Sequence, residues 1–344
     1  MSTGTETAAL EPGLEFLARR QLPSGGFSLR YGFDVASDET IPDDHALFGT
    51  ALIAQSLSAC GEEAARPIAD RAVARLAALM EPGGVWRHWA PEERRHHVVA
   101  PDADDTACIS VLLRDRGIPF PDNRELLLAN RDPEGRFYTW MVARWPPPRS
   151  ARLASIAVKR WRHPRLAREL WDTTPAEPPD VDGVVNANVL HYLGDGPHAP
   201  AVVAWLVGLF RRREEHACDK WYRGSCTFAW AVARAARAGV RGLDAIRDEM
   251  CERLVAGQAP DGRIGDGPLD TALAVCALSD WGARADESAA ACAYLEAAQG
   301  ADGAWPPAAM YFAGPRLDPP LPRWGSEELT TGFCVEALAR CRAT

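Results

Sequence analysis

Hydrophobic and polar positions follow a repeated two-part pattern along the chain. The first part is the end of an amphipathic helix, followed by a glycine-containing turn and then an aromatic or aliphatic residue. Glycine suits this place because it adopts the left-handed backbone conformation, and the next residue can then pack back over the turn. Copies of the first part lie at 16–27, 76–86, 126–137, 253–264 and 294–305.

The second part is a polar start that leads into an apolar helix. A clear glycine turn is missing only before the fourth copy. The pattern predicts six helix pairs of roughly 40 to 60 residues each, which together fill nearly the whole chain. Copies of the second part lie at 41–57, 101–113, 180–194, 222–236, 267–282 and 325–338.

The two helices of a pair differ in the distribution of their apolar residues. The first has a polar face, as in 70–80, whereas the second is apolar almost all round and must therefore be buried. We expect an all-α fold, an (α/α)6 toroid of six inner and six outer helices, as one domain over residues 1–344. An open superhelix is the alternative, but its groove would expose the apolar helices to water.

In such a toroid the inner helices point the same way, and their N-termini surround one mouth. The polar residues that begin these helices should gather there, around a cavity that is apolar at depth. These residues are Asp43, Asp44, His45, Asp102, Asp104, Asp105, Asp182, Asn186, Asp270, Glu327 and Glu328.

Composition and charge narrow the class of protein. The chain has 344 residues, 47% of them hydrophobic and 25% charged, and a formal net charge of −9, which argues against a nucleic-acid binder. Nine cysteines without a CxxC pair indicate reduced, packed thiols. The first residues resemble no secretory leader, and no apolar stretch reaches the length of a membrane span, so we expect a cytoplasmic protein.

Three aspartates stand at the start of the second apolar helix, in the stretch "PDADDTACISVLL" (101–113). A cap explains one of them, because aspartate is a favoured N-cap residue, but three in four positions repel one another. Helical spacing places Asp104 and Asp105 on faces that continue as apolar stripes. Burial and neighbouring carboxylates both raise the pKa of a carboxyl group, so one of the three is expected to hold a proton for donation.

The residues "DADDTA" (102–107) resemble the DxDDTA motif of class II terpene cyclases of the squalene–hopene cyclase branch. The turn segments "YLEAAQGADGAW" (294–305) and "FLARRQLPSGGF" (16–27) are similar to the QW repeats of these enzymes, although the second ends in Phe27. The resemblance implies that Asp104 is the general acid and that Asp102 and Asp105 orient it.

The chain departs from that family in two respects. The well-known members have two helical barrels and about twice this length, whereas this chain has room for one. The histidine that supports the acid in some members has no certain counterpart here. His191 and His45 are candidates, and both are also suited to structural roles in the core.

A carbocation in a cavity needs aromatic faces and exclusion of water. Most of the aromatic residues are expected to pack the core, with the turn residues Trp86, Phe137 and Trp305 fixing the outer helices. Phe228 and Trp230 are the stronger cavity candidates because they lie on an inner helix. The predicted substrate-binding residues are Trp86, Trp89, Tyr138, Trp140, Asn186, His191, Phe228, Trp230, Trp305, Tyr311 and Phe312.

A basic insertion interrupts the third helix pair at about 144–179. Residues 144–170 contain eight Lys or Arg against one Glu. This stretch is either a solvated helix, a clamp for a diphosphate group, or a patch that contacts an anionic membrane peripherally.

The favoured interpretation is a class II terpene cyclase that protonates a linear prenyl substrate and cyclises it without releasing diphosphate. It needs no cofactor, and magnesium would matter only for a diphosphate head group. One alternative is a carbohydrate-active enzyme that uses Asp44, Asp182 or Asp270, and another is a lipid-binding barrel without catalysis. A zinc prenyltransferase with Asp270 and Cys276 ranks last, because no suitable histidine follows them.

Overall fold

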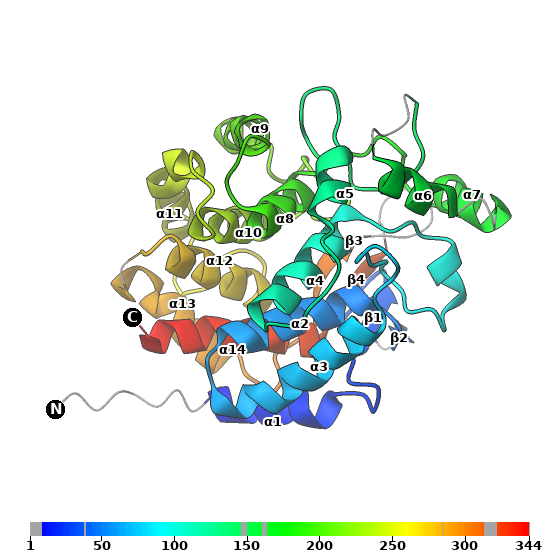
Figure 1. Ribbon diagram of the computed structural model, residues 1–344. Helices are drawn as coiled ribbons and strands as arrows, with labels where there is room; N and C mark the ends of the chain where they lie inside the picture. Colours follow the sequence, from blue (N-terminus) through cyan, green and yellow to red (C-terminus); the bar gives the residue numbers. More distant parts are fainter. Residues whose placement is uncertain are drawn as a thin grey trace.

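The computed structural model describes residues 9–37, 39–145, 150–159, 164–283, 285–312 and 322–343, and it is mainly helical (Figure 1). The apolar helix of each predicted pair is present within this described part. These helices are α2 (Leu47–Ala59), α4 (Ala103–Asp115), α8 (Gly183–Leu193), α10 (Ser225–Arg237), α12 (Pro268–Asp280) and α14 (Glu327–Ala343). The amphipathic partners are α1 (Leu10–Arg20), α3 (Arg66–Ala78), α5 (Arg124–Ala129), α9 (Ala199–Arg211), α11 (Arg247–Ala256) and α13 (Ala285–Ala297).

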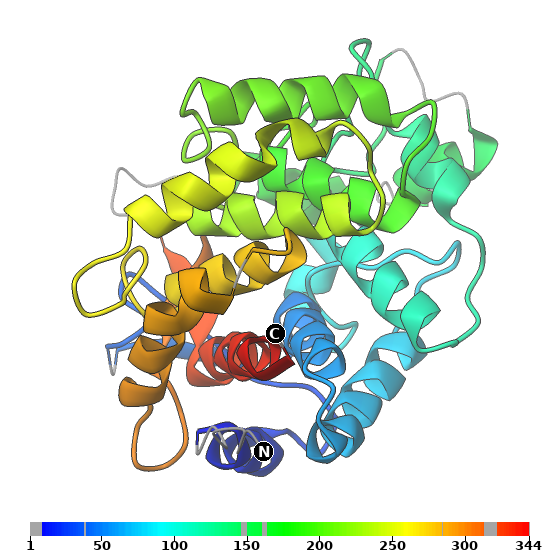
Figure 2. The ribbon, with the colours of Figure 1, turned by 90° about the vertical axis from the view of Figure 1, so that its left-hand side faces the viewer.

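The apolar helices pack against one another in a cycle. Helix α2 contacts α4, and the contacts continue through α8, α10, α12 and α14, which returns to α2. Figure 2 shows α14 in red with α1 in blue and α13 in orange outside it. Because both sides of each apolar helix are covered, residues such as Ile53, Leu113 and Leu273 are fully buried.

Two further helices, α6 (Ala151–Lys159) and α7 (Pro164–Thr173), occupy the segment predicted as the basic insertion. Three of the basic residues predicted for this insertion, Arg149, Arg160 and Arg162, lie outside the described residues.

Short 3₁₀ turns lie at Glu63–Ala65, Arg94–His97 and Leu243–Ile246. No helix of the described residues is long and apolar enough to cross a membrane.

A small antiparallel sheet corrects the prediction that the fold is all-α. Strands β1 (Leu29–Gly32), β2 (Ile41–Asp43), β3 (Ala308–Phe312) and β4 (Arg323–Ser326) form it in the order β2-β1-β4-β3. Tyr31 on β1 pairs with Trp324 on β4, so the sheet joins the first and last helix pairs. Strands this short carry no clear alternation of polar and apolar residues, which is the signal that predicts a strand.

The repeated turn has a repeated hydrogen bond. The residue after the turn donates its backbone N–H to a side-chain oxygen on the following apolar helix. The pairs are Phe27 with Thr50, Trp86 with Thr106, Phe137 with Asn186, Ile264 with Thr271 and Trp305 with Thr331, at 2.8–3.3 Å. This bond fixes where α2, α4, α8, α12 and α14 begin relative to the preceding turn. Asn186, which was predicted to bind substrate, belongs to this structural set.

Glutamine and glycine complete the turn that ends at Trp305. The Gln299 amide donates to the Gly303 carbonyl at 2.9 Å. Gly303 has φ +89°, and a Cβ there would stand 2.2 Å from the Pro12 carbonyl oxygen. The Trp305 indole N–H donates to the Leu295 carbonyl of α13 at 2.7 Å. Only glycine allows α1 to approach this closely.

The expectation that the thiols are reduced is wrong for one pair. Cys292 on α13 and Cys341 on α14 form a disulfide, whereas Cys60, Cys108, Cys218, Cys226, Cys251, Cys276 and Cys334 are free. The spacing of 49 residues between the two cysteines gave no signal for this pairing, because it depends on how two helices pack.

Trp305 is fully buried in the turn and lies outside the cavity described below, so its removal should affect stability alone. We expect Trp305→Ala to lower the free energy of unfolding by about 3–5 kcal/mol, because a large cavity and an unpaired carbonyl remain. Urea unfolding measures this change. Trp145→Ala, at a side chain that is 92% exposed, is the matched control and should change stability by less than about 0.5 kcal/mol. Equal effects of the two variants would contradict the assignment of Trp305 to the core.

Candidate active site

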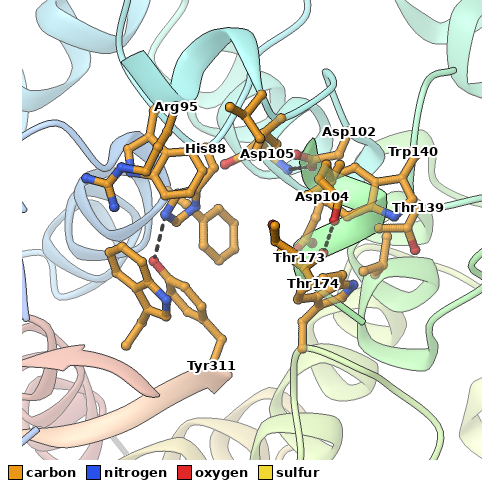
Figure 3. Close-up of a pocket in the computed structure, with 18 of the residues that line it drawn as sticks. His88, Arg95, Asp102, Asp104, Asp105, Thr139, Trp140, Thr173, Thr174 and Tyr311 are labelled. Carbon is orange, nitrogen blue, oxygen red and sulfur yellow. Dashed lines mark hydrogen bonds between the residues drawn. The ribbon is translucent and has the colours of Figure 1, made fainter. Parts of the chain in front are cut away.

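A cavity of about 350 Å³ lies at the N-terminal ends of several apolar helices. Phe48 of α2, the three aspartates of α4 and Val185 of α8 line it, and so do Trp221 and Tyr222 just before α10. Figure 3 shows His88 and Tyr311 on one side of the cavity, Trp140 and Thr139 on the other, and the aspartates between them. The cavity is therefore at the end of the helices where the sequence pattern predicts it.

Asp102 is the N-cap of α4. Its carboxylate accepts the backbone N–H of Asp105 at 2.7 Å, which satisfies one of the free amides of the first turn. Burial raises the pKa of Asp102 to about 7, and the neighbouring Asp104 contributes in the same direction. Capping and an elevated pKa thus coexist in one residue.

Asp104 is held by donors from two other parts of the chain. The Asn188 amide of α8 donates to Oδ1 at 2.7 Å, and the Tyr222 hydroxyl donates to Oδ2 at 2.5 Å. Burial raises the pKa of Asp104, while these two hydrogen bonds and the charge of Arg234 oppose that rise. The donors stabilise the carboxylate that is left when Asp104 gives up a proton.

Asp105 has different surroundings. Its Oδ1 atom is buried and has no hydrogen-bond partner among the described residues. Burial, together with the charges of Asp102 and Asp104, raises the pKa of Asp105 well above its ordinary value. These surroundings favour the protonated form of Asp105, because a carboxylate with an unpartnered, buried Oδ1 is poorly stabilised.

A continuous group of aromatic rings faces these carboxyl groups. Tyr222 contacts Phe48 and Tyr311 at centroid distances of 6.4 Å, and Tyr311 stacks on Trp324 at 6.1 Å. His88 meets Trp324 edge-on at 5.3 Å, and Trp89 extends the group. Strands β3 and β4 supply Tyr311 and Trp324, so the small sheet forms one wall of the cavity.

His88 is neutral at ordinary pH in these surroundings. Burial lowers the pKa of His88 to about 4, and the charge of Arg95 adds to the effect while Asp43 opposes it. The ring lies 3.4 Å from the Tyr311 hydroxyl. Arg95 is itself held by Asp43 at 2.9 Å and by Glu93 at 3.0 Å, and its guanidinium lies 4.6 Å from the centre of a Trp89 ring.

Comparisons with known proteins identify the fold. No protein-family model matches the chain, and no curated protein matches it in sequence. A protein from Actinoplanes is similar in structure over 99% of this chain and 100% of its own, at 21% identity and a TM-score of 0.72.

Two structures of variants of the type II terpene cyclase MstE from Scytonema also match. The complex with the product merosterolic acid A covers 97% of this chain and 96% of its own, at 14% identity and a TM-score of 0.69. The complex with the substrate geranylgeranyl dihydroxybenzoate has the same coverage, 13% identity and a TM-score of 0.66. The chain has the fold of a type II terpene cyclase.

Within this terpene cyclase fold, six of the predicted site residues line the cavity. They are Asp102, Asp104, Asp105, Trp89, Trp140 and Tyr311. Sequence reasoning missed Tyr31, Phe48, His88, Arg95, Tyr222 and Trp324, which line it as well. The sequence gives little indication of these residues, because each lies in a turn, in a short strand or at the end of a helix, where hydrophobic periodicity is not readable.

The remaining predicted site residues lie elsewhere. The indole of Trp86 donates to the Leu76 carbonyl of α3, which matches the role of Trp305. The ring of Tyr138 lies under Arg144, and that of Phe312 lies near Arg223 and Arg323.

Two aromatic residues of α10 and two histidines are also absent from the cavity lining. Phe228 lines a second cavity of about 140 Å³, and Trp230 packs edge-on against Phe333. His191 is half-buried, and desolvation lowers its pKa well below the ordinary value. The backbone N–H of His45 donates to Asp43 at 3.0 Å. None of these residues contacts Asp104 through a hydrogen bond within the described structure, so the support expected from a histidine comes from Asn188 and Tyr222 instead.

The other carboxylates considered for chemistry are engaged elsewhere. Asp182 accepts the Thr139 hydroxyl at 2.5 Å and the Lys220 backbone N–H at 2.9 Å. Asp270 accepts the Asp266 backbone N–H at 2.9 Å. Neither lines the cavity, and neither does Asp44. Among the described residues, no group of three or more His, Cys, Asp and Glu is arranged to hold a metal ion.

The elevated pKa of Asp102 predicts a pH dependence of stability. Between about pH 4 and pH 7 Asp102 binds more proton in the folded state than in the unfolded chain, so its contribution to the free energy of unfolding falls as the pH rises through this window. Asp102→Asn keeps the cap but removes the titration. At pH 8 the variant should therefore be more stable than the wild type by roughly 2–4 kcal/mol.

Urea unfolding at pH 5 and pH 8 measures this difference. Asp115→Asn, at an exposed carboxyl group on the same helix, is the control and should leave the pH dependence unchanged. An identical pH dependence in Asp102→Asn and the wild type would contradict the elevated pKa.

Proposed function

We propose that the protein is a class II terpene cyclase in which Asp104 protonates a terminal alkene or epoxide of a linear prenyl chain. The observation that carries this proposal is the pairing of a buried, donor-supported carboxyl group with an aromatic cavity. An acid that protonates carbon must be protonated at rest and must leave a stabilised anion. Burial provides the first condition for Asp104, and Asn188 with Tyr222 provides the second.

The cavity walls suit the cation that follows protonation. The faces of Tyr311, Trp324 and Trp89 would stabilise positive charge as it moves along the chain during ring closure. The apolar residues Val98, Val99 and Leu170 would exclude water until the last ring has formed. Deprotonation or capture of a water molecule then ends the reaction. The head group stays attached, and no cofactor takes part in these steps.

A prenylated aromatic compound is the substrate class we favour. MstE, with a similar fold over nearly its whole length, binds geranylgeranyl dihydroxybenzoate. A diphosphate head group is disfavoured because four carboxyl side chains but only one guanidinium line the described part of the cavity.

We infer that the cycle of packed helices is an (α/α)6 toroid and that residues 1–344 form one domain with an insertion at about 144–179. A lipid-binding barrel without catalysis is the alternative that the experiment below separates.

Turnover of a prenyl substrate panel tests the proposal. The panel contains geranylgeranyl dihydroxybenzoate, geranylgeraniol and its terminal epoxide, and geranylgeranyl diphosphate. The wild type should cyclise at least one of them, and Asp104→Asn should lower the rate by about 10³-fold. Asp115→Asn on the same helix is the control and should retain the wild-type rate. Binding without any product, or equal rates for Asp104→Asn and the wild type, would contradict the catalytic function.

We also propose that the protein is cytoplasmic and contacts membranes peripherally through Trp145, α6 and α7. Trp145 and Val158 are exposed, and so are Arg152, Arg165 and Arg168. Helix α7 also lines the cavity through Leu170 and Thr173. Basic and apolar side chains together suit an anionic lipid surface. A hydrophobic substrate could enter the cavity from that surface beside α7.

Co-sedimentation with vesicles tests this contact. The protein should bind vesicles of phosphatidylglycerol but not of phosphatidylcholine, and the triple variant Arg152→Gln, Arg165→Gln, Arg168→Gln should lose about tenfold in affinity or more. Arg241→Gln, at an exposed arginine after α10, is the control and should bind like the wild type. Equal binding to both kinds of vesicle would contradict the proposal.

A further inference from the structure

A belt of polar side chains crosses the apolar interior behind Asp104. Gln55 of α2, Asn188 of α8 and Arg234 of α10 form it, and each lies on a different helix of the cycle. Arg234 donates to the Gln55 amide oxygen at 2.9 Å and to the Asn188 amide oxygen at 2.8 Å. Gln55 in turn donates to the Cys108 carbonyl of α4 at 2.7 Å. The belt therefore begins and ends on the helix that carries the aspartates.

Arg234 is a buried cation without a directly paired carboxylate. Arg234 is 5% exposed, and its guanidinium lies 3.6 Å from the centre of a Trp230 ring. Among the described residues it forms no ion pair, and its Nε atom has no hydrogen-bond partner. A buried charge of this kind is costly unless an opposite charge lies near it. The Asn188 amide connects Arg234 to the Asp104 carboxyl group, and the charge of Arg234 lowers the pKa of Asp104, so we take Asp104 as the opposite charge that offsets this cost.

Asn188 stands between Arg234 and Asp104, and its orientation follows from both neighbours. A guanidinium only donates hydrogen bonds, so the side of the amide that faces Arg234 must be the oxygen. The NH₂ group then faces Asp104, to which it donates at 2.7 Å. Without Arg234 the amide could turn over, and its oxygen would then face the carboxylate.

We propose that Arg234 is a positioning residue for the acid, which fixes the Asn188 amide as a donor to Asp104 and supplies the counter-charge for the carboxylate formed on proton transfer. This inference rests on the proposed cyclase function. In that step the O–H bond of Asp104 breaks and a C–H bond forms with the electron pair of the terminal double bond. The negative charge stays on Asp104, where Asn188 and Arg234 stabilise it, and the positive charge moves to the substrate.

Other ionisable groups also act on Asp104 and must stay in place during the test. They come from α4, from the segment before α10 and from β3. These groups are Asp102, Asp105, Cys108, Asp219, Tyr222 and Tyr311. All of them remain when only Arg234 is replaced.

An NMR titration of protein labelled with ¹³C at the aspartate carboxyl groups tests the inference without any substrate. The Asp104 signal is assigned by its absence in Asp104→Asn. In Arg234→Gln, which removes the charge but keeps a donor to Asn188, the pKa of Asp104 should rise by about one pH unit or more. Arg234→Lys, which keeps the charge, should shift it less. Arg237→Met, one turn along α10 at a side chain that is 57% exposed, should leave it unchanged.

An Asp104 pKa that is the same in Arg234→Gln and the wild type would overturn the inference. If Arg234→Gln does not fold, Arg234→Lys is the deciding variant. Lysine lacks the forked donor of arginine, so the pKa of Asp104 should still rise measurably. An unchanged pKa of Asp104 in Arg234→Lys would overturn the proposal. Because this measurement needs no turnover, it separates failure of the inference from failure of the cyclase function.

Kinetics with geranylgeranyl dihydroxybenzoate supply a second readout. In Arg234→Gln, kcat should fall by about 10²-fold with KM nearly unchanged, and the alkaline limb of the kcat profile should move to higher pH. A purely structural arginine would lower the amount of folded enzyme and leave the position of that limb unchanged, which would contradict the proposal.

Discussion

The structure depends on three carboxyl groups being buried at the first turn of α4. Removing these groups from water penalises their charged forms, and each aspartate meets the penalty differently. Asp102 caps the helix, Asp105 retains its proton, and Asp104 is supported by donors from distant parts of the chain. The surroundings of Asp102 and Asp105 serve the structure, whereas those of Asp104 stabilise the carboxylate that remains after a proton is given up.

The donors reach Asp104 because the helices are held in a cycle with a fixed starting point for each. The hydrogen bond from each turn to the next apolar helix sets that starting point, and in α4 the acceptor is Thr106 of the aspartate motif itself. The stretch "DADDTA" therefore contains both the candidate acid and the residue that positions its helix. Asn188 lies 84 residues and Tyr222 118 residues from Asp104. The repeated contact positions α8, which carries Asn188, whereas the Asp219 carboxylate accepts the backbone N–H groups of Tyr222 and of Val184 on α8 and so ties the Tyr222 segment to that helix.

Much of this arrangement could be predicted from local sequence. The helix pairs, the burial of the apolar helices and the mouth at their N-termini follow from periodicity and turn chemistry. Trp89, Trp140 and Tyr311, which the sequence pattern predicts as substrate-binding residues, line the cavity, and their role in binding stays a prediction. The sheet and the residues Tyr31 and Trp324 were missed, since strands of three to five residues have no readable pattern and depend on pairing across the whole chain.

The choice among aromatic residues also exceeded what local sequence can show. Phe228 and Trp230 lie on the apolar helix α10, but Phe228 lines the second cavity and Trp230 packs against Phe333. Arg234 did carry a signal, because a cation within an otherwise apolar helical face needs a partner. That partner could be named only after the packing of α4, α8 and α10 was known.

The most direct test of protonation by the buried acid is a reaction run in D₂O. If Asp104 starts the reaction, its carboxyl group exchanges with solvent before each turnover. With a substrate that ends in an alkene, the cyclic product should then carry one deuterium on the CH carbon of the terminal double bond, next to the dimethyl carbon that becomes the cation, as mass spectrometry and NMR would show. A cyclic product without deuterium at that carbon would contradict the account.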